Sequence, residues 1–276
     1  AGERPASTSG ADVQVTPAAD GGWAPVEGTL LSRFAADVDP AAPLPEYPRP
    51  QLVRERWSNL NGLWDYAVVP GDPGVATGAG EARDIARPDG WDGEILVPFS
   101  LESALSGLGR RLAADECLVY RRDFEVPADW NGDRVLLHFG AVDWQAVVMV
   151  DGNAVGMHRG GYDPFHFDIT DALVGDGPHE LIVEVHDPTD AGPQPRGKQV
   201  SEPGGIWYTP SSGIWQTVWL EPVPEVRIAM PSIQTFVERS APSPEEQAKI
   251  SGSVLGTVDL IGPDGEALNE AEIRAG

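Results

Sequence analysis

The sequence has very little cysteine and no long apolar run. Cys117 is the only cysteine among 276 residues, which excludes a disulfide within the chain and a cysteine-based metal cluster. Because this residue stands in an apolar strand pattern, we expect a buried, unreactive thiol. No apolar run approaches the ~20 residues that a membrane-spanning helix needs.

Positive charge is scarce as well. Lys198 and Lys249 are the only lysines, and 19 basic against 43 acidic residues give a formal net charge of −24 at pH 7. Nucleic acids and anionic membranes are bound through basic surfaces, so neither is expected as a partner. An acidic coat favours an extracellular or cell-envelope location, although a cytoplasmic one stays open. The low-complexity start, residues 1–5, has no signal peptide and suits a processed or cropped chain.

Glycine, proline and tryptophan are abundant instead. The chain has 32 glycines, 26 prolines and nine tryptophans, and 41% of its residues are apolar. Such a composition favours short strands and many turns around a real core. We therefore predict an all-β protein.

Alternating apolar and polar residues predict about eight strands before residue 222. Asp151-Gly152, set between two apolar arms, is the clearest hairpin signal. Val135, Leu137 and Phe139 share one face of their strand, and His138 on the opposite face is expected to be a satisfied sheet residue. The predicted strands include residues 94–99, 118–127, 133–142, 144–151, 155–159, 180–186 and 214–220. This spacing indicates a sandwich or jelly roll.

Changes in composition divide the chain into three parts. Residues 1–47 are rich in Ala, Pro, Gly, Asp and Ser, which predicts an extended tail or a strap lying on the domain, with Trp23 as an anchor. The folded domain is predicted over residues 48–224. Residues 225–276 restart the strand pattern with about three strands, too few to close a second sandwich.

Most catalytic chemistries find no support in the sequence. It has no Gly-x-Ser-x-Gly elbow and no phosphate-binding loop. The histidines lack the spacing of a zinc site, so no metal site and no cofactor are expected. Calcium or sodium stays open as a bound ion, because Asp163, Asp168 and Asp171 offer oxygen ligands, although turn capping explains each of them equally well.

A stretch dense in tryptophan, residues 204–222, and the loop before it carry the candidate binding residues. Aromatic rings beside amides and acids suit sugars, which present apolar ring faces fringed by hydroxyl groups. The candidates for substrate binding are Trp207, Tyr208, Asp187, Asp190, Lys198 and Gln199. The structural alternative has equal weight: Trp215 and Trp219 fill the core, while Trp207 and Tyr208 seal a domain edge.

Short motifs follow one another from about residue 48 to residue 222. They are Leu60–Tyr66, Ile95–Phe99 with Glu102 and Ser103, Tyr120–Phe124, His138–Trp144, Gly160–Tyr162 with Pro164 and Phe165, Phe167–Thr170, Asp187–Asp190 and Ser212–Gln216. In this order they resemble the amino-terminal portion of glycoside hydrolase family 2, the β-galactosidase and β-glucuronidase group.

The resemblance implies a fold and a place in a larger enzyme. Residues 48–224 would form a jelly-roll, galactose-binding-like β-sandwich that binds sugar, and residues 225–276 would begin an immunoglobulin-like sandwich. In that family a TIM barrel follows and carries the acid/base and nucleophile glutamates. Both glutamates are therefore expected downstream of Gly276 and no catalytic residue within this chain, which would meet its carbohydrate substrate through that barrel.

Two functions from different classes follow. The first is the non-catalytic part of a retaining exo-β-glycosidase that acts on O-glycosidic bonds; alone, residues 1–276 would be inactive. The second is a stand-alone carbohydrate-binding or architectural β-sandwich. In the β-galactosidase and β-glucuronidase members an aspartate precedes the Ser-Gly-Ile turn, and Trp207 stands there instead. This difference argues against plain galactosidase or glucuronidase specificity.

Overall fold

The computed structural model describes residues 22–28, 31–71, 88–229, 232–239, 250–263 and 265–268. The low-complexity start, most of the glycine-rich loop after Gly71, Lys249 and Gly276 lie outside these residues. The prediction of an all-β chain is confirmed, since the longest helix described is the five-residue 3-10 helix η1, Arg33–Asp37. None of the described helices has the length and apolar character to cross a membrane.

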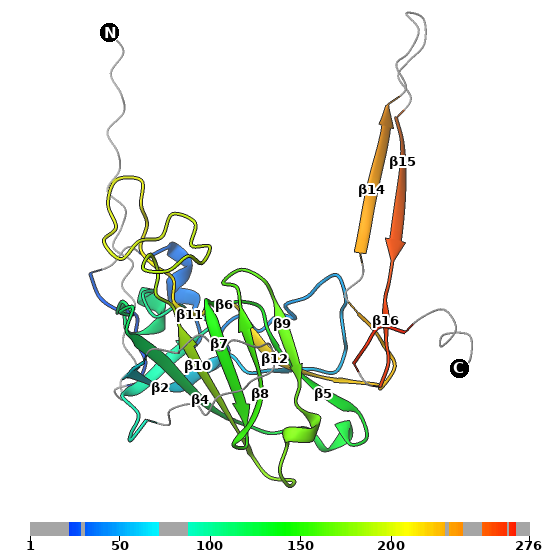
Figure 1. Ribbon diagram of the computed structural model, residues 1–276, viewed down its shortest axis with the longest axis horizontal. Helices are drawn as coiled ribbons and strands as arrows, with labels where there is room; N and C mark the ends of the chain where they lie inside the picture. The colour runs from blue at the N-terminus through cyan, green and yellow to red at the C-terminus, as the bar shows by residue number, and fades with distance from the viewer. Residues whose placement is uncertain are drawn as a thin grey trace, which may run out of the picture.

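Two antiparallel sheets pack face to face as a β-sandwich (Figure 1). The larger sheet has the order β3 (Gly93–Val97), β2 (Gly62–Pro70), β4 (Glu116–Phe124), β10 (His179–His186), β7 (Gln145–Val150) and β8 (Asn153–Arg159). The smaller has the order β1 (Ser58–Asn59), β12 (Val218–Val223), β5 (Arg134–Phe139) and β9 (Phe165–Asp168). A short ladder joins β6 (Val142–Asp143) to β11 (Gly213–Ile214).

The Asp151-Gly152 turn joins β7 to β8, as predicted. Both residues have positive φ, 51° and 78°, which matches the twist of a two-residue hairpin turn. The Asp151 carboxylate then accepts hydrogen bonds from the backbone of Val174 and Glu180 and contacts His179 Nδ1 at 2.7 Å. One turn residue therefore also fixes the start of β10.

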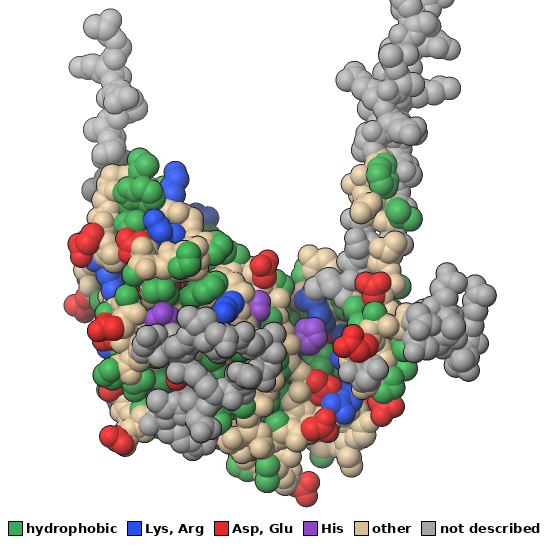
Figure 2. Space-filling model, in the orientation of Figure 1, with side chains coloured by type: hydrophobic (Ala, Val, Ile, Leu, Met, Phe, Trp, Pro, Cys, Tyr) green, Lys and Arg blue, Asp and Glu red, His purple; other side chains and the backbone are tan. Residues whose placement is uncertain are grey.

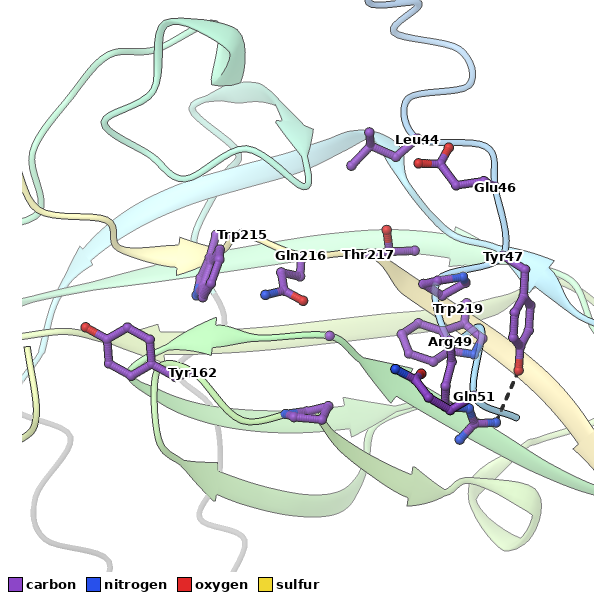
Figure 3. Close-up of a pocket in the computed structure, with 13 residues that line it drawn as sticks. Leu44, Glu46, Tyr47, Arg49, Gln51, Tyr162, Trp215, Gln216, Thr217 and Trp219 are labelled. Carbon is purple, nitrogen blue, oxygen red and sulfur yellow. Dashed lines mark hydrogen bonds between the residues drawn. The ribbon is translucent and has the colours of Figure 1, made fainter. Parts of the chain in front are cut away.

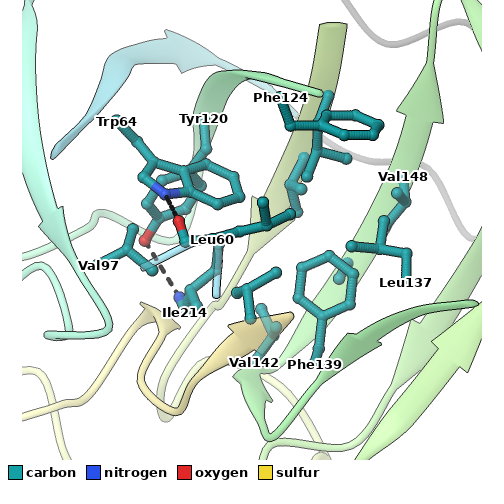
Figure 4. Packing of buried hydrophobic residues seen from close by; sticks show 14 of the residues in the cluster. Leu60, Trp64, Val97, Tyr120, Phe124, Leu137, Phe139, Val142, Val148 and Ile214 are labelled. Atoms are coloured by element: carbon teal, nitrogen blue, oxygen red, sulfur yellow. Dashed lines mark hydrogen bonds between the residues drawn. The ribbon is translucent and has the colours of Figure 1, made fainter. Parts of the chain in front are cut away.

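The core lies between the two sheets (Figure 4). Leu137 and Phe139 are fully buried, and Val135 joins them on the same face of β5, as the alternation predicts. Trp64 packs edge-on against Tyr120 and donates from its indole to Leu60 O at 2.8 Å. Cys117 is buried, as expected from its strand pattern.

The prediction of one strand over residues 214–220 is wrong. Gly213–Ile214 pairs with β6, whereas Val218–Val223 belongs to the smaller sheet. Residues 215–217 cross between the two ladders, so a single apolar run of sequence contributes one strand to each ladder. Pro222 lies within β12. The strand tolerates it because β1 pairs with β12 only as far as Leu220, so that side of β12 is unpaired at the proline.

The segment before β1 lies against the sandwich. Trp23 donates from its indole to Leu105 O at 3.2 Å, beside η2 (Ala104–Ser106). Farther along, Asn59 and Asn61 donate to the carbonyls of Leu44 and Pro43. The described part of the predicted strap is thus held at both ends by side chain to backbone hydrogen bonds.

A buried carboxylate ties the next part of this segment to β12. Glu221 has no exposed surface, accepts from the Tyr47 hydroxyl and from Trp219 Nε1, and pairs with Arg49 at 2.7 Å and with Arg54 at 3.0 Å. Burial alone raises the pKa of Glu221, but the surrounding donors outweigh it and hold the pKa at about 2. Glu221 is therefore ionised at neutral pH.

His138 belongs to the same outer face of the smaller sheet. Its ring stacks on Trp219 with centroids 4.7 Å apart, and its Nε2 lies 3.4 Å from Glu221. Burial lowers the pKa of His138, so the ring is neutral at pH 7. His138 is packed in the sheet as expected, but it is not fully satisfied, because its buried Nε2 has no hydrogen-bond partner among the described residues.

The remaining elements are short. The 3-10 helices η3 (Ala128–Trp130) and η4 (Thr170–Ala172) border the sandwich. Beyond residue 224, β13 (Arg227–Ile228) pairs with β16 (Leu260–Ile261), and β14 (Ser232–Arg239) pairs with β15 (Ile250–Thr257). The β14–β15 pair extends away from the sandwich in Figure 1. The assignment of residues 225–276 to an immunoglobulin-like domain, like the other two domain boundaries, stays a prediction.

Candidate functional site

All six predicted binding residues lie on one long loop, residues 187–212, between β10 and β11. Gln199 and Tyr208 form an isolated parallel bridge. Tyr208 N donates to Lys198 O at 2.9 Å, and Val200 N donates to Tyr208 O at 3.1 Å. These bonds close a smaller loop whose tip is Ser201–Trp207.

The tip exposes an apolar group. The exposed fractions are 66% for Ile206, 44% for Trp207 and 63% for Tyr208. Figure 2 shows hydrophobic and basic side chains together at the upper left of the molecule, where this loop lies in Figure 1. Trp219, in contrast, is 3% exposed. Trp207 is therefore an exposed loop residue and Trp219 a packed sheet residue, whereas Trp215 lies on the crossover between them and is partly buried.

The two predicted aspartates hold the loop in place. Asp187 is buried, and its carboxylate accepts from Ser212 Oγ and from Thr189 N, both at 2.8 Å. Asp190 accepts from the backbone of Ser201 at 3.2 Å. Each carboxylate already has protein donors, so the contacts present are ones that fix the shape of the loop.

Lys198 and Gln199 differ in their surroundings. Lys198 is exposed at the loop surface. The Gln199 amide oxygen accepts from Ser211 N at 2.6 Å, while its nitrogen lies 3.5 Å from the Tyr162 hydroxyl. Gln199 thereby links the loop to the turn that follows β8.

Three buried carboxyl groups converge beneath the loop, at Ser212. Ser212 N donates to Glu102 at 2.8 Å, and its hydroxyl donates to Asp187. Asp143, opposite Gly213 in the β6–β11 ladder, is 4% exposed. Burial and the nearby carboxyl groups of Asp187 and Glu102 raise the pKa of Asp143 to about 7. Burial likewise raises the pKa of Glu102 and of Asp187.

Two glycines make this arrangement fit. A Cβ on Gly161 would overlap the Asp143 carboxylate, and one on Gly213 would overlap the Tyr120 hydroxyl, which accepts from Ile214 N at 3.1 Å. Gly213 also has φ +91°, a conformation that side chains disfavour. The arrangement of Glu102, Asp143 and Asp187 therefore depends on glycines that let the backbone come close to neighbouring side chains.

Sequence reasoning did not nominate Glu102, Asp143 or Ser212. All three stand in the motifs that carry the family resemblance, so a signal was present. Their convergence could not be seen, because Glu102 and Ser212 are 110 residues apart in the chain.

The catalytic glutamates were expected downstream of Gly276. The described residues end at Leu268, so Gly276 and whatever follows it lie outside them. The placement of the glutamates beyond Gly276 therefore stays a prediction.

Replacing Asp143 with Asn is expected to stabilise the protein increasingly as the pH rises from about 4 to about 7. The folded-state pKa of about 7 exceeds the ~3.9 of an unfolded aspartate. The stability that protonated Asp143 confers is therefore complete below about pH 4 and is lost as the pH rises through 7. The variant should gain on the wild type by up to about 1.4 kcal/mol per pH unit in that window.

Urea unfolding across that window measures the difference in free energy of unfolding between the two proteins. Asp176→Asn, the same substitution at an exposed aspartate, is measured beside it as the matched control. A constant difference between Asp143→Asn and the wild type would show that Asp143 is ionised throughout.

Two of the three aspartates considered as ion ligands, Asp168 and Asp171, are engaged by the protein. Arg134 pairs with Asp168 at 2.6 Å and with Asp171 at 2.9 Å. Asp168 also accepts from Thr170 N, as turn capping predicts. His138 and His166 are cross-strand neighbours, with ring centroids 5.1 Å apart. Among the residues that the structure describes, no three His, Cys, Asp or Glu side chains are grouped to hold a metal ion.

Residues 57–224, more than half of the chain, match the family described as glycosyl hydrolases family 2, sugar binding domain. The chain belongs to this family. The matched range includes both sheets of the sandwich, the long loop and the three buried carboxyl groups. The resemblance drawn from the short motifs is confirmed.

Curated relatives of this family 2 chain are glycosidases. It is 27% identical over 146 residues to a β-glucuronidase of Paenibacillus borealis, covering 51% of this chain and 22% of the relative. It is 36% identical over 103 residues to a β-galactosidase of Thermoanaerobacter pseudethanolicus, covering 37% of this chain and 13% of the relative. With the β-glucuronidase of Canis lupus familiaris the identity is 35% over 138 residues, covering 48% of this chain and 20% of the relative.

The fold also matches solved structures. A structure of Bifidobacterium dentium β-glucuronidase complexed with coumarin-3-O-glucuronide aligns with 79% of this chain and 42% of that one, with a TM-score of 0.50 and 22% identity. This likeness concerns the fold alone. The family 2 chain spans between 13% and 22% of the length of the three curated relatives above.

Proposed function

We propose that the chain is the non-catalytic amino-terminal part of a retaining exo-β-glycosidase that cleaves O-glycosidic bonds, and that its long loop shapes the rim of the sugar pocket. The observation that carries the proposal is the family match over residues 57–224. The exposed Trp207 and Tyr208, on a loop fixed from below by Asp187 and Gln199, add support. Rigid aromatic rings suit the apolar faces of sugars.

In this proposal the acid/base and nucleophile carboxylates belong to a barrel domain downstream of Gly276. Glu102 and Asp187 both accept hydrogen bonds from Ser212, and Asp143 lies opposite Gly213 beside them, so these carboxyl groups organise the loop. We also propose an extracellular or cell-envelope location and no resident cofactor. The carbohydrate substrate would be shared between the barrel and the loop.

The chain alone should hydrolyse no aryl β-glycoside, whereas the full-length enzyme should hydrolyse at least one of a panel that includes glucosides, galactosides and glucuronides. Release of the aryl group, measured with purified protein of residues 1–276, tests the first half. Measurable turnover by this chain would overturn the placement of the chemistry. An inactive full-length protein that still binds sugar would favour a stand-alone carbohydrate-binding module.

Trp207→Ala in the full-length enzyme should raise KM about two- to tenfold, which is the range expected for loss of one aromatic stacking contact. Phe34→Ala is the control for loss of an exposed aromatic ring, since Phe34 is 62% exposed on η1 and is not part of the long loop. Steady-state kinetics on the best aryl glycoside of the panel measures both variants. Equal KM and kcat in Trp207→Ala and the wild type would remove Trp207 from the rim.

A further inference from the structure

A pocket of about 680 Å³ lies on the outer face of the smaller sheet, under the segment that precedes β1 (Figure 3). This size is within the range of small-molecule sites. One wall is the segment Leu44–Gln51, and the other is Tyr162 with residues 215–217 of the crossover between β11 and β12. The predicted binding residues of the long loop do not line it.

One end of the pocket is aromatic and rigid. Trp215 and Tyr162 meet nearly at right angles, 75°, with centroids 6.4 Å apart. The Trp215 indole donates to Gly161 O at 2.7 Å, which fixes the plane of its ring. Tyr162 is 48% exposed. A fixed indole beside a tyrosine that is open to solvent gives an apolar platform at low cost in conformational entropy.

Two side-chain amides line the pocket, Gln216 in its middle and Gln51 beside Arg49 at the other end (Figure 3). Gln216 and Gln51 have no hydrogen-bond partner among the described residues. Gln216 lies directly across Gly140, where a Cβ would come within 2.7 Å of the Gln216 Cβ. Figure 3 shows Gln216 between the Trp215–Tyr162 end and the Tyr47–Arg49 end. Each amide offers two donors and an acceptor to vicinal hydroxyl groups.

The charges at the other end favour a neutral ligand. The Arg49 guanidinium forms an ion pair with Glu221 at 2.7 Å, so its charge is already balanced within the protein. Glu46 adds a negative charge to the lining. The chain as a whole carries −24, which disfavours anionic ligands. An aromatic platform, unpartnered amides and little net positive charge match the surface of an uncharged sugar.

From this geometry we infer that the pocket between Leu44–Gln51 and Tyr162–Gln216 is a second, non-catalytic binding site for a neutral saccharide of about two rings. The ring faces would stack on Trp215 and Tyr162, and hydroxyl groups would bond to Gln216 and Gln51. Trp207 and Tyr208 do not line this site, although Tyr162 lies 3.5 Å from the long-loop residue Gln199. The inference does not depend on the proposed enzymatic function.

Isothermal titration calorimetry of residues 1–276 with cellobiose, lactose and glucuronic acid tests the inference. At least one of the two neutral disaccharides should bind with a Kd on the order of 1 mM, and glucuronic acid should bind more weakly. Gln216→Ala and Tyr162→Ala should each weaken that disaccharide about fivefold. Gln234→Ala, which removes an exposed amide of β14, should leave the Kd unchanged.

The melting temperature of each variant shows that the fold is kept, and Gln51→Ala provides a further variant from the opposite wall, with the same expected weakening. Absence of binding for both neutral disaccharides would overturn the inference. So would binding that survives Gln216→Ala and Tyr162→Ala but is lost in Tyr208→Ala, because the sugar would then occupy the long loop. Neither result bears on hydrolysis by the full-length enzyme, so the two proposals fail separately.

Discussion

Glu221→Ala is expected to lower the free energy of unfolding by about 3–5 kcal/mol, the usual loss when one partner of a buried ion pair is removed. Glu221 is fully buried and is the common partner of Arg49, Arg54 and the Tyr47 hydroxyl. Without it, two largely buried guanidinium groups lose their counter-charge together. Urea unfolding at pH 7, followed by tryptophan fluorescence, measures the loss.

The same variant should release the segment that precedes β1. Tyr47 and Arg49 are joined to β12 through Glu221, so limited proteolysis should cut near residues 44–54 much faster than in the wild type. Arg56→Ala breaks the exposed pair with Asp133 and should cost less than about 1 kcal/mol. Equal losses in the two variants would mean that Glu221 holds no more than a surface contact does.

The contribution of Glu221 also has a defined pH dependence. Its pKa in the folded protein is about 2, below the ~4.3 of an unfolded glutamate. The stability that it confers is thus complete above about pH 4 and is lost as the pH falls through 2. The cost of Glu221→Ala should shrink over this acid range, opposite in direction to the Asp143 effect at higher pH.

Gly213→Ala should destabilise the protein by about 3 kcal/mol or more, since backbone strain and overpacking each cost about 1–3 kcal/mol. The residue has φ +91°, and a methyl group there would overlap the Tyr120 hydroxyl and come within 3.1 Å of Leu118 Cδ2. Relief requires the Ser212–Gly213 turn to move. Ser212 would then lose its bonds to Glu102 and Asp187, so hydrogen exchange should increase over residues 187–214.

Two companion variants make this second expectation specific. Gly204→Ala has open space around the new methyl group and no positive φ, so it should change stability by less than about 0.5 kcal/mol. Tyr120→Phe removes the overlapping hydroxyl and should recover part of the loss in the double variant, as a double-mutant cycle would measure. A cost for Gly213→Ala no larger than that for Gly204→Ala would contradict the packing seen here.

Local patterns in the sequence determined the strands, their faces and one hairpin. Val135, Leu137 and Phe139 alternate along β5 and meet the other sheet, because side chains of a strand point to opposite faces in turn. Asp151-Gly152 forms its turn because both positions need positive φ. The order of short motifs was enough to place the chain in its family.

The same patterns could not divide the stretch 213–223 between two ladders. A single apolar, β-branched run reads as one strand, and only pairing with β6 and with β5 decides where one ladder ends and the next begins. Register is a property of two strands together. The crossover that results at residues 215–217 carries a wall of the proposed second saccharide site.

What the sequence determined by itself is an acidic, all-β family 2 chain with a tryptophan-rich loop. Only the tertiary structure decided which polar residues work together: Tyr47 meets Glu221 across 174 residues, and Glu102 meets Ser212 across 110. The physical reason is that alternation reports which face a side chain takes, whereas an ion pair or hydrogen bond depends on the path of loops that bring distant segments within about 3 Å.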